Sequence, residues 1–336
     1  MTTWFSNLHP ALRSSWHPVA AAAEVGTEQP VGVTLLGERW VVTRLGGQLV
    51  ALADRCPHRL APLSAGRVVD DTLECAYHGW RFSAEGACVR VPALGESGPI
   101  SSRAACQPVA AVAERFGLVW LSLDPPITPL PVVPEWDDPA FTVVPLPPMD
   151  WNASAAQMAD NFLDVAHFPF THRNTFGDPD DQEVAPYPLE REGWTFRTDH
   201  FHSTKALADS VNAPTSFEVH ERRMRFTCTA PHHVYLRIDY PVEDVTLTIL
   251  FFHQPVDAET TRLWAFNIRN DIADGRCTPS QTINFQLAVA REDQALLEQF
   301  PVKAVPLDPG VESHTRADKI TVELRRMLAD LVDAAT

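Results

Sequence analysis

The sequence predicts an α+β protein, in which an all-β N-terminal domain precedes a domain made of an antiparallel sheet covered by helices. Three observations support this fold. Short strands punctuated by glycines fill residues 31–124, prolines crowd 125–149, and alternating strands followed by two amphipathic helices fill the remainder. A chain of 336 residues is long enough for two domains that each bury a core. We therefore expect domains at 1–124 (core about 16–124) and 150–336, joined by a linker at 125–149.

The N-terminal domain is expected to begin its sheet with three short strands between residues 31 and 56. The segments VGVTLLG, RWVVTRL and QLVALADRC are rich in strand-forming residues. Gly46-Gly47, between the second and third segments, suits a tight hairpin turn with positive φ. The segment FGLVWLSLD at 116–124 predicts a closing strand.

The linker and the second domain follow from proline content and hydrophobic period. Prolines over 124–149 prevent an internal ladder or a helix, so this segment is expected to be a stiff, extended connector. Apolar residues at helical spacing predict a helix over 153–167. Alternating segments from about 190 to 270 predict an antiparallel sheet, and amphipathic patterns predict helices over roughly 280–299 and 315–334.

Charge and hydropathy exclude several classes of partner. The formal net charge is −16, and no Lys/Arg-rich run stands out, so a nucleic-acid partner is not expected. No segment approaches the roughly 20 consecutive apolar residues of a membrane helix, so no membrane partner is expected either. The first residues lack the basic start and apolar run of a secretory signal, which predicts a cytoplasmic protein.

Two cysteines and two histidines form the pattern with the most specific chemistry. Cys56 and His58 form C-x-H, and after a gap of sixteen residues Cys75 and His78 form C-x-x-H. In a Rieske-type 2Fe–2S cluster, two thiolates hold one iron and two imidazoles hold the other. Tetrahedral zinc is the alternative metal, although zinc fingers usually group their cysteines apart from their histidines. The pattern favours the 2Fe–2S cluster.

A second pattern consists of Asp164, His167 and His172. Asp164 and His167 are three residues apart and are expected to share a helix face, and Pro169 is expected to end or kink that helix so that His172 turns back. Two histidines and one carboxylate on one side of a metal leave positions open, which is typical of non-haem Fe(II) sites for dioxygen. A surface or capping role for the two histidines is the alternative.

With both patterns present, the chain resembles the Rieske non-haem iron oxygenases. The segment Cys75-Ala76-Tyr77-His78-Gly79-Trp80 is similar to their second cluster-binding loop, and residues 160–172 match their pattern D-N-x-x-D-x-x-H-x4-H. Respiratory Rieske proteins carry an extra cysteine in each loop, where this sequence has Ala61 and Tyr77. The resemblance covers nearly the whole chain. It extends to a subgroup with one α-type subunit, which includes caffeine-type N-demethylases, vanillate and dicamba O-demethylases and saxitoxin-pathway hydroxylases.

The resemblance implies roles for residues of the second pattern. His167 and His172 would be ligands of the mononuclear iron. Asp164 would bridge a ligand histidine and a cluster histidine of the neighbouring subunit, and Asn161 would lie behind the ligands.

The third iron ligand comes from elsewhere in the chain. The segment Arg291-Glu292-Asp293-Gln294 is expected to open a helix and resembles a late segment of the family, which implies Asp293 as the ligand. A solvated helix start is the alternative, and Asp271 and Asp274 compete for the role. The substrate pocket is expected along the second domain's sheet, with four aromatic candidates that could equally be core residues: Phe251, Phe252, Trp264 and Phe266.

The activity implied is that of the oxygenase component of a multi-component monooxygenase. A separate reductase, alone or with a ferredoxin, would bring electrons from NAD(P)H, and a C–H bond of a small organic substrate would be hydroxylated. Where that carbon is a methyl group on N or O, the outcome is demethylation. A homotrimer is also implied. The alternatives are an alkaloid-like natural-product hydroxylase, an arene cis-dioxygenase and, outside enzymes, a Rieske electron carrier.

Overall fold

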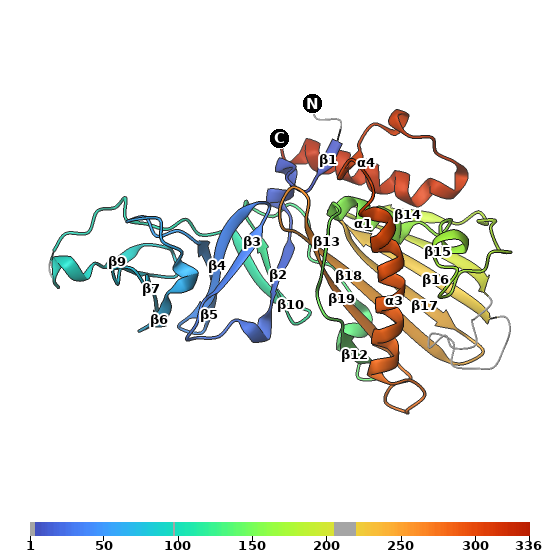
Figure 1. Ribbon diagram of the computed structural model, residues 1–336, viewed down its shortest axis with the longest axis horizontal. Coiled ribbons are helices and arrows are strands. Elements are labelled where there is room, and N and C mark those ends of the chain that lie inside the picture. The colour runs from blue at the N-terminus through green and yellow to red at the C-terminus, as the bar shows by residue number, and fades with distance from the viewer. Residues whose placement is uncertain (1–3, 97, 205–219) are drawn as a thin grey trace. The chain divides into compact units, whose positions relative to one another are not determined.

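The computed structural model describes residues 4–96, 98–204 and 220–336 (Figure 1). The chain divides into two compact units. Unit 2 consists of residues 12–127 and 255–257, and unit 1 consists of residues 1–11, 128–254 and 258–336.

Unit 2 is built almost entirely from short antiparallel strands, as the sequence predicts. Its three sheets have the orders β10-β11-β2, β3-β4-β5 and β6-β7-β8-β9. The strands are β2 (His17–Ala21), β3 (Val31–Leu35), β4 (Glu38–Leu45), β5 (Gln48–Ala53), β6 (Arg67–Val69), β7 (Thr72–Glu74), β8 (Arg81–Phe82), β9 (Cys88–Arg90), β10 (Ala111–Arg115) and β11 (Leu118–Ser122).

The predicted hairpins of unit 2 are confirmed. Gly46 and Gly47 join β4 to β5 with φ of 57° and 80°, the left-handed conformations that a two-residue turn of this kind requires. The predicted closing strand is β11, whose five residues are all buried between β10 and β2.

Unit 1 contains an eight-stranded sheet of order β12-β19-β18-β17-β16-β15-β14, with β13 also paired to β19. These strands are β12 (Thr142–Pro145), β13 (Met149–Trp151), β14 (Leu189–Glu192), β15 (Thr195–Thr204), β16 (His220–Thr229), β17 (His233–Tyr240), β18 (Val245–Pro255) and β19 (Thr261–Arg269). A small separate sheet pairs β1 (Trp4–Ser6) with β20 (Ala304–Pro306). The antiparallel sheet predicted over 190–270 is confirmed, and residues 205–219 of that range lie outside the described residues.

The helices of unit 1 are α1 (Ala155–Leu163), α2 (Phe168–Thr171), α3 (Pro279–Leu297) and α4 (Lys319–Ala334). In Figure 1, α3 runs across one face of the large sheet. Every residue of β18 is buried, as expected for a strand covered on both faces. The α+β fold class is therefore confirmed. No helix in the described part of the chain is long and apolar enough to cross a membrane.

The proline-rich stretch does more than connect. Residues 142–145 and 149–151 form strands β12 and β13, which both pair with β19 at the edge of the large sheet. An edge strand tolerates proline, because one side of its backbone needs no ladder partner. The domain boundaries at 124 and 150 remain a prediction.

Candidate functional site

Two loops of unit 2 carry the cysteine and histidine pairs, and their backbones repeat the same turn. In the first loop, Cys56 N donates to Ala61 O (2.9 Å) and Leu60 N donates to Cys56 O (2.9 Å). In the second loop, Cys75 N donates to Trp80 O (2.8 Å) and Gly79 N donates to Cys75 O (3.0 Å). Leu60 and Gly79 occupy the same place in the two turns and both have positive φ, 60° and 70°.

The turns bring the four predicted cluster residues together as two inner thiols and two outer imidazoles. Cys56 and Cys75 are each 2% exposed and belong to the core of unit 2. The rings of His58 and His78 lie 4.5 Å apart, and Trp80 stacks on His58 at 4.5 Å. This separation of sulfur from nitrogen donors suits a cluster with one iron facing inward and the other facing outward.

Two polar features of these loops support a bound group. Burial, together with the neighbouring Cys75, raises the pKa of Cys56 to about 11, so the thiolates need a metal to hold their charge. The buried Nδ1 of His58 meets no hydrogen-bond partner among residues 4–96, 98–204 and 220–336. The residues present therefore fit a 2Fe–2S cluster.

In unit 1, the helix before the two histidines is shorter than predicted. Helix α1 ends at Leu163, and Asp164 is its C-cap, with extended backbone angles (φ −78°, ψ 130°). Asp164 Oδ1 accepts a hydrogen bond from Ala166 N at 2.8 Å, which stabilises a turn instead of another helical turn. Asp164 and His167 therefore share no helix face, and Pro169 does not end α1: it lies in the first turn of α2, where proline is tolerated.

The same turn brings the predicted triad together. His167 Nε2 lies 3.1 Å from His172 Nε2, and Asp293 Oδ1 lies 3.5 Å from the first nitrogen and 3.2 Å from the second. One ligand atom from each residue lies within 4.8 Å of the others. Asp293 does not open a helix, as the sequence suggested, but lies near the C-terminal end of α3.

The protonation of the two imidazoles points to a cation between them. His167 Nδ1 donates to Asp164 Oδ2 at 3.3 Å, and His172 Nδ1 donates to Glu292 Oε2 at 2.8 Å, since a carboxylate oxygen only accepts. In the neutral rings both Nε2 atoms then carry lone pairs, which face each other and Asp293 Oδ1. In the described part of the chain, that oxygen accepts no well-aligned hydrogen bond. Three electron pairs directed at one point fit a divalent metal.

Electrostatics in the metal-free protein agree with this view. Burial alone would lower the pKa of His167, but the hydrogen bonds and charges of Asp164 and Asp293 outweigh burial and raise it to about 9. Burial would raise the pKa of Asp293, but His167 and His172 hold it well below its usual range. A proton on His167 thus substitutes for the positive charge that the site is built to hold.

Glu292 is a further residue of the candidate site, and no motif in the sequence points to it. Its Oε2 accepts hydrogen bonds from His172 Nδ1 (2.8 Å) and from Thr175 Oγ1 (2.7 Å). A carboxylate on the far nitrogen of a ligand histidine fixes the ring and its tautomer. Glu292 precedes Asp293 in the sequence, but only the approach of α3 to His172 reveals this contact.

Asp160 and Asn161 of the D-N motif lie in α1. Both carboxylate oxygens of Asp160 accept from Arg325 of α4, at 2.6 and 3.0 Å, and Arg325 also donates to Glu312 at 2.8 Å. This pairing ties the end of α1 to the C-terminal helix. Asn161 is half-buried one residue further along α1.

The competing third ligands are engaged elsewhere. Asp271 is fully buried and forms an ion pair with Arg269 at 2.7 Å, and Asp274 pairs with Arg276 at 2.7 Å. Neither belongs to a group of converging ligand atoms in the described residues.

An apolar cavity lies directly beside the triad. His167, His172 and Asp293 line it together with side chains from α1, α3 and the sheet. The apolar residues are Phe162, Phe168, Phe176, Met224, Leu236, Ile238, Ile249, Phe251, Phe285 and Val289. Of the four aromatic pocket candidates, Phe251 lines this cavity, whereas Phe252, Trp264 and Phe266 are buried in the core.

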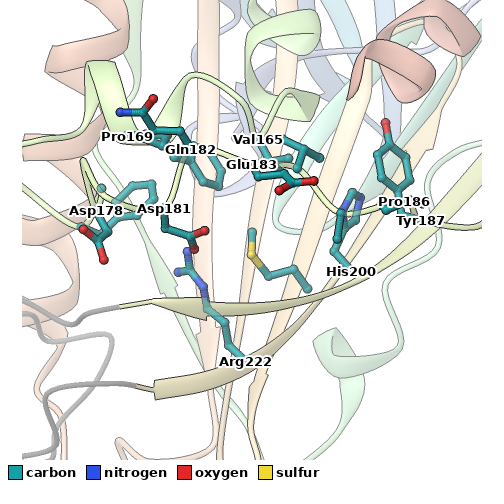
Figure 2. Close-up of a pocket in the computed structure, with 16 residues that line it drawn as sticks. Val165, Pro169, Asp178, Asp181, Gln182, Glu183, Pro186, Tyr187, His200 and Arg222 are labelled. Atoms are coloured by element: carbon teal, nitrogen blue, oxygen red, sulfur yellow. The ribbon is translucent and has the colours of Figure 1, made fainter. Parts of the chain in front are cut away.

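A larger cavity of about 280 Å³ adjoins the apolar one (Figure 2). Four residues line both cavities, and they are Phe168, Phe176, Arg222 and Met224. The larger cavity is also lined by the polar segment 178–183 and by His200. We call this larger cavity the outer chamber.

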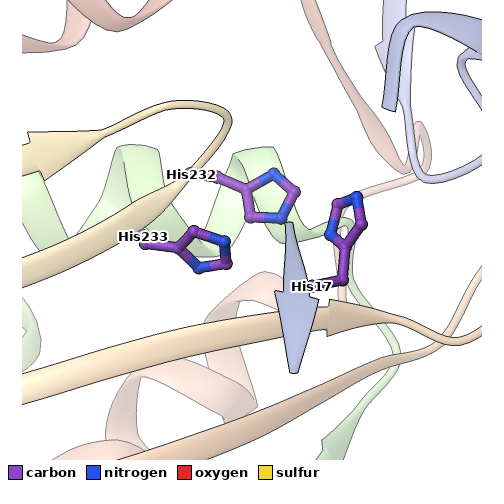
Figure 3. Close-up of side chains that lie close together, drawn as sticks. All are labelled: His17, His232 and His233. Atoms are coloured by element: carbon purple, nitrogen blue, oxygen red, sulfur yellow. The ribbon is translucent and has the colours of Figure 1, made fainter. Parts of the chain in front are cut away.

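Other buried histidines lie outside these sites. His232 directly precedes β17 and His233 is the first residue of that strand, with ring centroids 5.3 Å apart (Figure 3). His253 Nδ1 donates to His232 O at 2.7 Å, and burial lowers the pKa of His253 to about 4. In unit 2, His17 Nε2 donates to Leu12 O at 2.8 Å. The backbone hydrogen bonds and the lowered pKa values of His17 and His253 are those of neutral core histidines.

Comparison with known proteins matches both units of the chain. Family models match residues 15–111 (Rieske [2Fe-2S] domain) and residues 151–334 (Vanillate O-demethylase oxygenase C-terminal domain). Methylxanthine N1-demethylase NdmA of Pseudomonas putida is 33% identical over 96% of this chain and 90% of its own length. Methylxanthine N3-demethylase NdmB of the same species is 32% identical over 95% of this chain and 89% of its own length.

Solved structures agree. The structure of NdmA from Pseudomonas putida CBB5 with caffeine superposes with a TM-score of 0.87 and 30% identity, covering 98% of this chain and 93% of that one. Dicamba monooxygenase bound to dicamba shares the fold, with a TM-score of 0.79 at 20% identity and coverage of 96% and 98%. The resemblance inferred from the two motifs is confirmed. The chain belongs to the Rieske non-haem iron oxygenases, which combine a 2Fe–2S cluster with a mononuclear iron site.

Proposed function

We propose that this chain hydroxylates a C–H bond of a small organic molecule. Where the hydroxylated carbon is a methyl group on nitrogen or oxygen, the reaction removes that methyl group. The observation that carries the proposal is the convergence of His167, His172 and Asp293 at the wall of an apolar cavity. The names of the relatives, methylxanthine N1- and N3-demethylases, support the choice of a methyl group.

The residues divide the work between two sites. Cys56, His58, Cys75 and His78 would hold the cluster. His167, His172 and Asp293 would hold Fe(II). When bound, the cluster supplies electrons, and the mononuclear iron supplies the activation of dioxygen.

Other residues of the chain prepare the mononuclear site. Asp164 and Glu292 hold the Nδ1 protons of the two histidines, which keeps both Nε2 lone pairs directed at the metal position. The phenylalanines of the apolar cavity exclude water and offer flat surfaces to a planar substrate. We assign to Asp164 the bridging role between the two kinds of site, and to Asn161 a supporting role behind the ligands.

The partners follow from the electron requirement. A separate reductase, alone or with a ferredoxin, would deliver electrons from NAD(P)H, and dependence on that coenzyme favours a cytoplasmic enzyme. We also propose a homotrimer, in which Asp164 of one subunit serves the cluster of the next. Sedimentation of the holoenzyme tests the trimer, and a monomer with full activity would contradict it.

Metal content and turnover test the function. The anaerobically purified protein should contain about three irons and about two acid-labile sulfides per chain. With a reductase, a panel of methylxanthines and methoxybenzoates should include a compound that stimulates NADH-linked oxygen uptake and releases formaldehyde.

A matched variant separates the oxygenase from an electron carrier. His167→Ala should lower the iron content to about two per chain, keep the cluster spectrum and abolish oxygen uptake. Two irons per chain in the wild-type protein, with no oxygen uptake on any compound, would leave only an electron carrier. A diol product instead of formaldehyde or a single hydroxyl would identify an arene dioxygenase.

A further inference from the structure

Strand β16 places three arginines close together, and one of them differs from the others. Arg223 and Arg225 lie on one face of the strand and form ion pairs, Arg223 with Asp199 and Arg225 with Asp239 (2.5 Å). Arg222 points to the opposite face, since successive side chains of a strand alternate. There it is only 6% exposed, and within the described part of the chain no carboxylate forms an ion pair with it.

Arg222 lies close to the candidate metal triad, with one aromatic ring between them. Its guanidinium carbon lies 5.5 Å from the centre of the Phe176 ring, and that ring stacks on His172 with centroids 4.7 Å apart. The sum of these two separations is the greatest distance that can separate the guanidinium from the His172 ring. A single substituted aromatic ring spans such a distance.

The cavities give such a molecule a place. Arg222 belongs to the wall shared by the apolar cavity and the outer chamber of about 280 Å³. Its Nε is buried and has no hydrogen-bond partner among the described residues. The inner cavity is otherwise apolar apart from the triad and Gln286. A molecule that fits this lining is therefore apolar over most of its surface and has one polar end, which can pair with the guanidinium of Arg222.

Acidic side chains also lie in the outer chamber that Arg222 lines. Asp178, Asp181 and Glu183 line the outer chamber, and Figure 2 shows Asp181 and Arg222 pointing toward one another. Glu183 pairs with Arg316 at 2.8 Å. The competing arrangement is one in which Asp181 balances the charge of Arg222 across the chamber, which leaves no need for an anionic ligand.

We propose that Arg222 is an anion-binding subsite, which takes the carboxylate of an aromatic-acid substrate and orients its far end toward the metal triad. Guanidinium binds carboxylate with two parallel N–H donors, and such a charge-assisted pair gains strength in a buried site. The inference rests on the proposed function for the identity of the substrate site, and it narrows the substrate class to molecules with one acidic end.

Binding of two matched probes to the holoenzyme tests the subsite without turnover. Benzoate and benzamide have the same shape and differ in charge, so their dissociation constants are measured anaerobically, without reductase, by calorimetry or ligand-observed NMR. The wild-type protein should bind benzoate more tightly than benzamide. Arg222→Gln should weaken benzoate binding about tenfold or more and leave benzamide binding unchanged.

The matched control is Arg223→Gln, on the same strand but on its opposite face, which should leave both probes unaffected. Equal affinity of the wild-type protein for benzoate and benzamide would overturn the proposal, and this comparison needs no variant to fold. Equal weakening of both probes by Arg222→Gln would overturn it as well. Wild-type enzyme that prefers benzoate but takes up no oxygen with any substrate would contradict the proposed function and retain the subsite.

Discussion

Replacing Glu292 with glutamine isolates the contribution of one charge to the metal site. The Glu292 carboxylate accepts from Nδ1 of His172, whose side chain is 2% exposed, and the same oxygen accepts from Thr175 Oγ1. Glutamine keeps the length of the side chain and one acceptor oxygen but removes the negative charge. Thus the change weakens the electron donation of His172 while leaving a hydrogen bond available.

The expected magnitude follows from that single contact. A hydrogen bond to a charged acceptor contributes about 1.5–3 kcal/mol, and its neutral replacement retains about 1 kcal/mol. The difference of about 1–2 kcal/mol corresponds to a loss of about 5- to 30-fold in metal affinity. This agrees with the loss of about 10- to 100-fold that removal of such outer partners produces in other metal sites.

The assay is a titration of the iron-depleted mononuclear site with Co(II), followed by its visible absorption, which needs neither turnover nor a substrate. Glu298→Gln is the matched control, because Glu298 caps the same helix, is exposed and makes no contact with the triad. We expect Glu292→Gln to weaken Co(II) binding and Glu298→Gln to leave it unchanged. Wild-type affinity in the Glu292 variant would refute the reasoning that its charge acts through His172.

Three further predictions concern stability and the cluster. Arg325→Met should destabilise the fold by about 2–3 kcal/mol in denaturant titrations, because it removes the buried cation that pairs with the half-buried Asp160 carboxylate. Because burial lowers the pKa of His253 to about 4, the wild-type protein should lose about 3 kcal/mol of stability at this residue between pH 6.5 and pH 4. His253→Gln should abolish that part of the loss, as measured by denaturant unfolding at several pH values. Cys75→Ser should abolish the visible absorption of the cluster and leave about one iron per chain in metal analysis, because one thiolate of the inner pair is lost.

The sign of the pH effect is fixed by the direction of the pKa shift. In the folded protein the His253 ring is held in its neutral form. Its contribution to stability is therefore complete above the pKa of about 6.5 in the unfolded chain, and it declines as the pH falls toward the pKa of about 4 in the folded protein. A His253→Gln variant whose stability changes with pH as steeply as that of the wild-type protein over this interval would contradict the assignment.

The control for the ion pair between Arg325 and Asp160 is a double variant in which apolar residues replace both. It should recover most of the stability that Arg325→Met loses.

The sequence predicted local structure best where the chain itself determines it. The hairpin at Gly46-Gly47 and the strand at 118–122 follow from turn chemistry and alternation, which act over a few residues. The predicted end of the first helix of the second domain was wrong for an equally local reason. Asp164 accepts a hydrogen bond from the backbone of Ala166, and the helix ends at Leu163, six residues before Pro169, although apolar spacing continues past it.

Candidate ligands for both metal sites could be proposed from the sequence, because the chemistry of such sites demands fixed residue types at short spacings. Cys56, His58, Cys75 and His78 stand out because few other functions require sulfur and nitrogen donors in alternation. His167 and His172 stand out for the same reason. Asp293 was reached through resemblance alone, since a carboxylate within a polar helix has no spacing relation to histidines more than a hundred residues earlier.

The sequence by itself determined the fold class, the family and the cluster loops, because these depend on residue types and on contacts between near neighbours. Only the tertiary structure decided which carboxylate completes the triad and which one holds His172, because α3 must be brought against the α1–α2 turn before Asp293 and Glu292 differ from any other acidic pair. The same holds for Arg222. Its neighbours on β16 have the same chemistry, and the face of the strand toward the cavity gives it a different environment.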